Sequence, residues 1–339
     1  MYERYERVMK IKTVSIDGLW GRYSLKWDLN PDVNVLSGIN GSGKSTILLA
    51  IAGLISGKGL KERYLSRFNK LTLEMSDDST VSLKIISGVE SDEDRALAAE
   101  RPNETMIWIA NCKYTQIIAI EKEGGYTISE DTFPITDCEF ISTFDFPISR
   151  EEIKQGIRYV NFISNTHKIS ELDLMLDNMV DRYRSYQIDL STTMSKIMTS
   201  GEANPETIKE LFGRKNALLD LLDELFEGSG KRMNRDKGEI ELIFESDGKS
   251  HPYSELSAGE KQLLLIILAV FMQEQREAIL IMDEPEISLH IDWQNRLLAD
   301  IKRLNPNCQV IVSTHSPAMI LDGWHAAVTN MTDIISSAS

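Results

Sequence analysis

The sequence has few cysteines and no apolar run long enough to cross a membrane. Its three cysteines, Cys112, Cys138 and Cys308, are scattered and odd in number, so they fit neither a metal-ligand spacing nor a disulfide framework. The longest apolar run, Leu263–Met272, is too short for a bilayer, and the charged residues 1–7 lack the apolar core of a signal peptide. We therefore expect reduced, structural cysteines and a cytoplasmic protein that does not bind a membrane.

Positive charge is also scarce. The chain carries 37 Lys and Arg against 52 Asp and Glu, which gives a formal net charge of −15. Because nucleic-acid binding depends on cations that neutralise phosphates, this excess argues against a broad nucleic-acid-binding surface, although it leaves room for a local basic patch. Hydrophobic residues make up 42% of the chain, as in ordinary globular proteins, and the length suggests two or three subdomains.

A glycine-rich segment matches the phosphate-loop pattern G-x-x-x-x-G-K-[ST] at every fixed position. It follows the apolar run Val33–Leu36, a predicted buried strand, and precedes a helix predicted from Ser45 to about Leu54. Glycines let backbone N–H groups point at phosphate oxygens, and the helix N-terminus adds positive potential. A chance glycine-rich turn is the alternative, but the flanking elements favour nucleotide binding. The residues predicted to bind the nucleotide are Gly38, Ile39, Asn40, Gly41, Ser42, Gly43, Lys44, Ser45 and Thr46.

Within this loop, two side chains have specific expected roles. Lys44 should reach the β- and γ-phosphates of a bound nucleotide, and the Ser45 hydroxyl should ligate Mg²⁺.

Two adjacent carboxylates follow a second predicted buried strand, Ile279–Met282. The carboxyl end of a parallel strand is where α/β sheets place their ligands. Asp283 suits the Mg²⁺ shell through a water molecule, and Glu284 suits a general base that positions an attacking water. Two acids at a strand end are often only a solvated turn, but the upstream phosphate loop favours the catalytic interpretation.

The segment Leu256–Gln262 directly precedes a predicted buried helix. Ser257 and Gly259 at the helix N-terminus would form an anion site that is rich in hydrogen-bond donors. The alternative is a simple helix cap, in which Ser257 is the N-cap and Glu260 occupies the capping-box position. Both can hold at once.

A histidine, His315, follows the predicted buried strand Val310–Val312. Its imidazole could bond a γ-phosphate and register its loss, although a lone histidine is more often structural. The order of the four segments along the chain favours the functional interpretation.

Together these segments resemble the motifs of ABC-type ATPases. In that resemblance, Walker A, the signature, Walker B and the H-loop correspond to Gly38–Thr46, Leu256–Gln262, Asp283-Glu284-Pro285 and Thr314-His315-Ser316. The L-S-x-G-E signature and the D-loop at Ser288-Leu289-His290 are more like the soluble SMC, RecF and OLD branch than the transporters. The segment Gly18–Tyr23 also looks like small bacterial ATPases that are paired with effector genes in anti-phage systems and retrons.

The resemblance implies an α/β fold with two parts. Residues 1–150 and 239–339 would form an ABC-ATPase head, with a P-loop mixed sheet and an N-terminal antiparallel β subdomain. Residues 151–238 would form an inserted α-helical hairpin lobe.

The resemblance also implies a head-to-tail homodimer or a higher oligomer of dimers. ATP bound to the phosphate loop of one subunit would be closed over by the signature of the other. Lys44, Glu284 and His315 would be catalytic, and Ser45 and Asp283 would hold Mg²⁺. The signature would contribute Ser257, Gly259 and Glu260.

The predicted insert has helical periodicity. From Leu172 to Ile197 apolar and aromatic residues recur in alternating steps of four and three, and after the turn Ser200–Pro205 a second helical pattern ends at Phe226. Two such helices form an antiparallel hairpin with arms of about 30–40 Å. A lobe folded onto the core and a free arm both fit this pattern.

A basic loop is predicted after the second helix. Its cations are Lys231, Arg232, Arg235 and Lys237. A solvated linker is favoured over a nucleic-acid contact.

Three features depart from the better-known members of this branch. No Q-loop glutamine is evident: its expected place is near Ser142–Asp145, and Gln116 is a poorly placed substitute. The insert is far shorter than the coiled-coil arms of SMC proteins. The segment after His315 is too short for the nuclease domain of OLD-type proteins.

The leading hypothesis is an ATP-hydrolysing ABC-type ATPase whose dimerisation controls a separately encoded effector, a nuclease or toxin, in a bacterial anti-phage complex. The alternatives are an ATP-binding scaffold with slow turnover and a RecF-like DNA-repair ATPase, against which the net charge argues. A transporter subunit is the least favoured.

Overall fold

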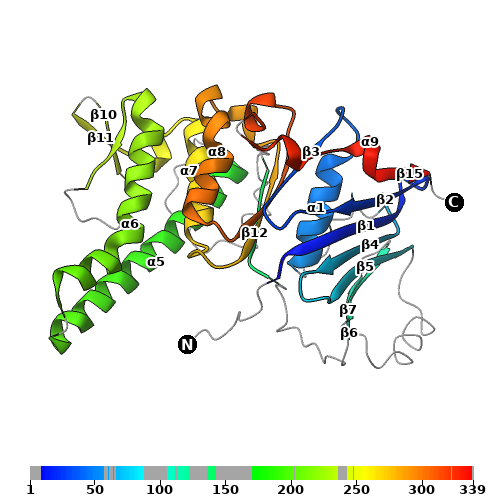
Figure 1. Cartoon of the computed structure of the whole chain (residues 1–339), viewed down its shortest axis with the longest axis horizontal. Coiled ribbons are helices and arrows are strands. Elements are labelled where there is room, and N and C mark those ends of the chain that lie inside the picture. The colour runs from blue at the N-terminus through cyan, green and yellow to red at the C-terminus, as the bar shows by residue number, and fades with distance from the viewer. Residues whose placement is uncertain are drawn as a thin grey trace, which may run out of the picture. The chain divides into compact units, whose positions relative to one another are not determined.

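The computed structural model describes the chain in two compact units (Figure 1). The described residues are 9–56, 60, 64, 66–87, 105–110, 114–121, 136–142, 170–201, 203–235, 243–246, 248–321 and 323–337. One unit, here called the sheet unit, comprises residues 1–141, 275–285 and 306–339, and the other, the helical unit, comprises residues 142–274 and 286–305. The predicted insert, residues 151–238, falls within the range of the helical unit.

A five-stranded sheet forms the centre of the sheet unit. Its order is β14 (Val328–Asn330), β3 (Val33–Ser37), β13 (Cys308–Ser313), β12 (Ala278–Asp283) and β8 (Cys138–Ser142). The first four of these strands are parallel. Every residue of β12 and β13 is buried, which explains why both read as continuous apolar runs in the sequence.

A seven-stranded antiparallel sheet forms the second layer. Its order is β15 (Ile335–Ser337), β2 (Tyr23–Asp28), β1 (Ile11–Leu19), β4 (Lys70–Met75), β5 (Thr80–Ser87), β7 (Tyr114–Glu121) and β6 (Thr105–Ala110). Burial alternates along β4, as expected for a strand with one face toward a core. The predicted mixed sheet and N-terminal antiparallel β subdomain are therefore confirmed.

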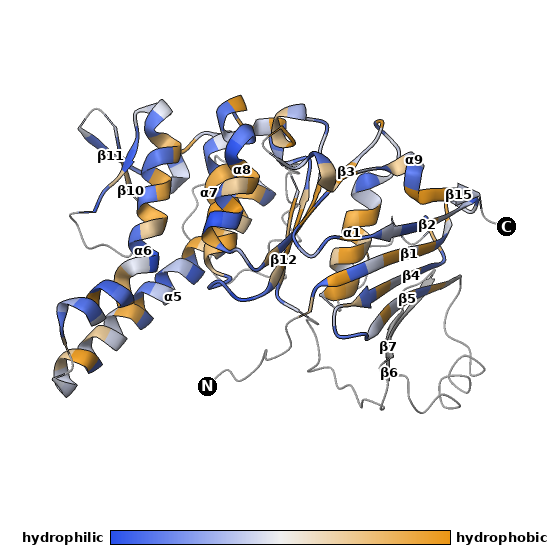
Figure 2. Ribbon diagram, viewed as in Figure 1, coloured by the Kyte–Doolittle hydropathy of each residue, from blue (hydrophilic) through white to orange (hydrophobic). Residues whose placement is uncertain are grey.

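Helix α1 (Lys44–Ile55) contacts β12 and β13 of the central sheet and β4 and β5 of the antiparallel sheet. Its side chains are apolar on nearly all sides, which Figure 2 shows as an orange helix. Ile47, Leu48 and Ile51 are completely buried in the core shared by the two sheets. The helix was predicted within one residue at each end.

The chain after His315 adds one strand to each of the two sheets. Strand β14 pairs with β3, and after the short helix α9 (Met331–Ile334) strand β15 pairs with β2. A Cβ on Gly38 would lie 3.0 Å from the Met331 side chain, so this segment packs directly on the start of the phosphate loop. Sequence patterns did not predict these short elements.

The described part of the helical unit contains four long helices and a small sheet. The helices are α5 (Glu171–Ser200), α6 (Pro205–Phe226), α7 (Ala258–Phe271) and α8 (Ile291–Leu304). The sheet has the order β11 (Lys249–Pro252), β10 (Ile243–Ser246) and β9 (Arg232–Met233). Strand β9 lies within the basic loop that the sequence predicted after the second helix.

Helices α5 and α6 form the predicted hairpin (Figure 1). A capping box of Ser170 and Asp173 begins α5, left-handed Gly201 ends it, and the Asn204 side chain caps α6. The predicted apolar positions from Leu172 to Leu190 are buried except for the partly buried Tyr186, whereas residues 191–200 are mostly exposed. The base of the hairpin is therefore a packed lobe, and its tip is a free arm.

No helix in the described part of the chain is long and apolar enough to span a membrane.

Candidate functional site

The phosphate loop connects the end of β3 to the start of α1. Gly43 is the N-cap of α1, and no side chain caps the helix. Its φ is +96°, and a Cβ there would lie 2.3 Å from the Trp20 indole. Only glycine permits both this backbone conformation and this close approach. The helix thus begins with backbone N–H groups that no capping side chain occupies, as an anion-binding helix terminus requires.

Three predicted catalytic side chains converge beside this loop. The Lys44 ammonium is 4% exposed and donates hydrogen bonds to the Gly38 carbonyl oxygen at 3.0 Å and to His315 Nε2 at 2.7 Å. Glu284 Oε1 lies 3.9 Å from Lys44 Nζ and 3.4 Å from His315 Nε2. Because an ammonium group only donates, His315 accepts through Nε2. The structure therefore brings together groups from α1, from the end of β12 and from the segment after β13.

The two carboxylates at the end of β12 have different environments. Asp283 is 1% exposed and accepts a hydrogen bond from the Ser313 hydroxyl at 2.5 Å. Glu284 is half-buried and has a left-handed backbone, with φ of +49°. Its backbone N–H donates to the Ser313 carbonyl oxygen at 3.0 Å and to Ser313 Oγ at 3.2 Å. Sequence reasoning did not identify Ser313, which immediately precedes the Thr314-His315-Ser316 motif.

The residues present fit a nucleotide with Mg²⁺. Ser42 Oγ is buried and has no hydrogen-bond partner among the described residues, and a Cβ on Gly38 would lie 3.0 Å from it, so the orphaned hydroxyl lies inside the loop. A phosphate oxygen would satisfy it. The described residues contain no group of three or more His, Cys, Asp and Glu that is arranged to hold a metal ion. Mg²⁺ beside a nucleotide is usually held by one or two protein groups together with phosphates and water, and Ser45 and Asp283 are the residues that could provide those groups here.

Other loop residues differ in exposure. Ile39 is 82% exposed and Asn40 is exposed, whereas Thr46 is buried and its hydroxyl accepts a hydrogen bond from Arg67 Nη1 at 2.8 Å. The side chains at the tip of the loop are therefore accessible, and its helical end is fixed by a contact that sequence reasoning did not find.

The signature segment begins α7 in the helical unit. Ser257 is the N-cap, and its hydroxyl and backbone form the predicted capping box with Glu260, which is confirmed. The Glu260 carboxylate is buried and also accepts a hydrogen bond from Lys231 at 2.5 Å. Burial alone would raise the pKa of Glu260, but the hydrogen bonds from Lys231 and Ser257 outweigh it and hold that pKa below its ordinary value. These contacts favour a structural role for Glu260.

Gly259 lies against the segment that begins α8. A Cβ at this position would be only 2.2 Å from the Ser288 carbonyl oxygen. Ser257, Ala258 and Ser288 are exposed beside this contact. The signature and the Ser288-Leu289-His290 segment therefore present one continuous surface.

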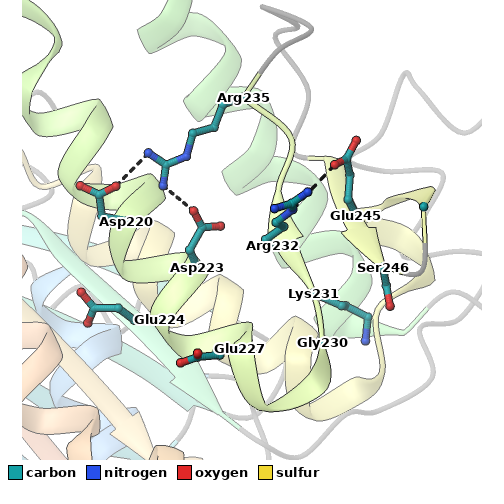
Figure 3. A pocket seen from close by; sticks show the side chains of 11 residues that line it. Asp220, Asp223, Glu224, Glu227, Gly230, Lys231, Arg232, Arg235, Glu245 and Ser246 are labelled. Atoms are coloured by element: carbon teal, nitrogen blue, oxygen red, sulfur yellow. Dashed lines mark hydrogen bonds and ion pairs between the residues drawn. The ribbon is translucent and has the colours of Figure 1, made fainter.

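The helical unit also contains a charged cavity of about 690 Å³. Figure 3 shows side chains from α6, β9 and the β10–β11 hairpin around it. Arg235 pairs with Asp220 at 2.8 Å and with Asp223, and Arg232 lies 4.0 Å from Glu245. The residues that line it are Asp220, Asp223, Glu224, Glu227, Gly230, Lys231, Arg232, Arg235, Glu245, Ser246 and Gly248.

These ion pairs bear on the basic loop predicted after α6. Lys231, Arg232 and Arg235 all face carboxylates of the same unit, and Lys237 lies outside the described residues. A nucleic-acid contact through these cations would have to compete with their present partners.

The chain matches a known protein family over residues 33–322. The family is described as "AAA domain, putative AbiEii toxin, Type IV TA system". The chain belongs to this family.

Individual relatives agree with this assignment. The chain is 24% identical over 337 residues to the Septu protein PtuA of Bacillus thuringiensis, which covers 92% of this chain and 73% of that protein. It is 24% identical over 166 residues to the retron Ec83 probable ATPase of Escherichia coli, covering 40% of this chain and 31% of that protein. The expected kinship with ATPases of defence systems and retrons is confirmed.

A solved structure supports the fold. The Smc head domain with an extended coiled coil from Pyrococcus furiosus, bound to the C-terminal domain of ScpA, aligns with a TM-score of 0.50. The alignment covers 98% of this chain and 96% of that chain, at 14% sequence identity. The ABC-ATPase head predicted from the motifs is confirmed as the fold.

The Q-loop candidates and the three cysteines lie partly within the described residues. Gln116 lies within β7, where its backbone pairs with β5 and β6. Of the segment Ser142–Asp145, where the Q-loop glutamine was expected, residues 143–145 lie outside the described residues. Neither Cys138 nor Cys308 forms a disulfide among the described residues, and Cys112 lies outside them. Burial, together with the nearby carboxylates of Glu139 and Asp137, raises the pKa of Cys138.

Proposed function

We propose that the protein binds and hydrolyses ATP and that ATP-driven, head-to-tail dimerisation controls a separately encoded effector in a bacterial anti-phage complex. The observation that supports hydrolysis most directly is the convergence of Lys44, Glu284 and His315 within 3.9 Å of one another beside the phosphate loop. A lysine, a carboxylate and an imidazole at one helix N-terminus suit phosphoryl transfer to water.

Each of these side chains has a defined task in this mechanism. Lys44 leaves its present partners to bind the β- and γ-phosphates, and the loop N–H groups bind the remaining phosphate oxygens. Glu284 holds the attacking water in line and accepts its proton, and His315 donates to the γ-phosphate. Ser45 and Asp283 would hold Mg²⁺, which would neutralise charge on the phosphates.

The exposure of the signature supports the proposed dimerisation. Ser257 and Ala258 are exposed at the start of α7, and an exposed helix N-terminus attracts the phosphates of a nucleotide. In the proposed dimer, this surface of one protomer covers the nucleotide held by its partner. ATP then stabilises the interface by mass action, and hydrolysis loosens it.

Control of an effector is proposed from kinship and from the contacts of the hairpin. Relatives named as a Septu protein and a retron probable ATPase support the defence role. Helix α5 is tied to the signature region by the pairs Lys261–Asp173 at 2.8 Å and Tyr253–Asp177 at 2.9 Å. A movement of α7 would therefore be transmitted to the hairpin.

A scaffold with slow turnover is the second candidate, because Lys44 and His315 also suit binding without fast hydrolysis. Steady-state turnover compared with that of Glu284→Ala separates the two. A RecF-like role in DNA repair is disfavoured by the net charge of −15, and salt-dependent DNA binding would revive it.

The central test compares wild type with Glu284→Gln by light scattering after gel filtration in Mg²⁺ and ATP. The variant keeps the binding groups but loses the general base, so we expect it to accumulate as a dimer while wild type returns to monomer. Equal nucleotide-dependent dimerisation of the two proteins would contradict the mechanism. Glu255→Gln, an exposed carboxylate of the helical unit, serves as the control.

A further inference from the structure

Ser313 connects the two acidic residues at the end of β12. It is the last residue of β13 and completely buried, and its register partners are Asp283 on β12 and Leu36 on β3. Backbone pairing at this position would be available to almost any residue. The side chain makes the contacts that distinguish serine.

The Ser313 hydroxyl acts as both donor and acceptor. It donates to Asp283 Oδ1 at 2.5 Å and accepts from the Glu284 backbone N–H at 3.2 Å. One oxygen atom thus bridges the carboxylate proposed to hold Mg²⁺ and the backbone of the proposed general base.

The contact with Asp283 matters because that carboxylate is almost completely buried. A buried carboxylate needs hydrogen-bond donors, and a fixed donor on one oxygen sets which way the other oxygen points. A metal ligand that is held in this way needs no reorientation when the ion arrives.

The contact with Glu284 matters because its backbone is strained. A left-handed φ of +49° is uncommon for a residue with a side chain and persists only where the surroundings impose it. Two acceptors of Ser313, the carbonyl oxygen and the hydroxyl, hold the same N–H. This conformation places the Glu284 carboxylate beside Lys44 and His315.

We propose that Ser313 is a positioning residue of the ATPase site: its hydroxyl orients Asp283 toward Mg²⁺ and holds Glu284 in its left-handed conformation. The inference rests on the proposed function. A positioning role differs from a purely structural one because loss of the Ser313 hydroxyl should change both the Mg²⁺ requirement of nucleotide binding and kcat.

The test replaces Ser313 and a matched serine. Ser79 is also buried in the sheet unit, and its hydroxyl donates to Asp77 Oδ1 at 2.5 Å, in the turn between β4 and β5. Ser313→Ala and Ser79→Ala therefore delete the same kind of hydrogen bond at two places. Ser313→Thr keeps a hydroxyl on the Cβ.

Two measurements are made on each full-length variant. The first is binding of a fluorescent ATP analogue with EDTA and across a Mg²⁺ titration, and the second is kcat with saturating Mg²⁺ and ATP. For Ser313→Ala we expect unchanged binding in EDTA, a Mg²⁺ requirement raised about ten-fold and kcat lowered about ten- to a hundred-fold, the usual range for groups that orient metal ligands. Ser79→Ala should match wild type, and Ser313→Thr should recover most of the loss.

Every outcome decides the inference. Wild-type values for Ser313→Ala, or equal losses in Ser79→Ala, would overturn it. If Ser313→Ala unfolds, the near-isosteric Ser313→Cys takes its place, and an unchanged Mg²⁺ requirement in that variant overturns the inference as well. A wild-type protein without ATP hydrolysis would contradict the proposed function alone, because the Mg²⁺ dependence of nucleotide binding still tests Ser313.

Discussion

The phosphate loop and the signature helix differ in how their polar groups are satisfied. In the sheet unit, the phosphate loop contains a buried hydroxyl with no described partner, an uncapped helix start and a lysine held by the Gly38 carbonyl oxygen, His315 and the Glu284 carboxylate. In the helical unit, the signature helix is capped by its own side chains, and its buried glutamate has three donors. The first region has polar groups that a ligand would satisfy. In the second, the cap residues Ser257 and Glu260 satisfy each other, although Gln262 Nε2 is buried with no partner among the described residues.

This difference indicates that the two regions have different roles, one in nucleotide affinity and the other in the dimer interface. A region with unsatisfied donors gains most from a bound anion, so it should provide the affinity for the nucleotide. A helix start whose capping box is already formed has side chains that are held in place, so it loses little side-chain entropy when it is covered and suits an interface that forms and separates repeatedly. Substitutions in the two regions should therefore affect different measurements.

The largest effect is expected from Lys44→Ala. The change removes two charge-assisted contacts to phosphate, which together contribute about 3 kcal/mol or more, so ATP affinity should fall at least about a hundred-fold. Titration with a fluorescent ATP analogue measures this directly. Lys70→Ala, an exposed lysine of the same unit, is the control, and retention of tight binding by Lys44→Ala would remove the basis for the comparison.

A smaller effect, on a different measurement, is expected from Gly259→Ala. The new Cβ would meet the Ser288 backbone oxygen, which cannot move as a side chain can, so the helical unit should lose about 1–3 kcal/mol of stability. Its exposed surface would shift, and nucleotide-dependent dimerisation should be lost while ATP binding to the monomer is retained. Gly228→Ala is the matched control because a Cβ there meets nothing within 4 Å. Weaker ATP binding by Gly259→Ala monomers would mean that the two regions do not act separately.

The sequence predicted those elements whose structure is determined by the residue pattern within the element itself. Long apolar runs identified β3, β12 and β13, the glycine pattern identified the loop, and the heptad pattern identified the hairpin. Residues in these segments are buried on every side or along one stripe, so their own spacing reports their structure.

What the sequence did not predict depends on distant partners. Strand β11, Lys249–Pro252, is polar and mostly exposed, and only its pairing with β10 makes it a strand. Ser313 gained its significance from register with β12, and Gly259 from its contact with Ser288. Short strands and single contacts of this kind carry no periodic signal, because the residues that determine them lie elsewhere in the chain.

The smallest effect expected in this comparison concerns the ion pair that completes the signature cap. The pKa of Glu260 is lowered in the folded protein, so its contribution to stability is present above its unfolded pKa, near 4.5, and is lost as the pH falls through the lower folded value. Lys231→Met should cost about 1 kcal/mol at pH 7 and should reduce the acid sensitivity of unfolding below about pH 4.5. Chemical denaturation at several pH values measures both. Lys249→Met, an exposed lysine on β11, is the control, and equal acid profiles for the two variants would show that the cap does not depend on this pair.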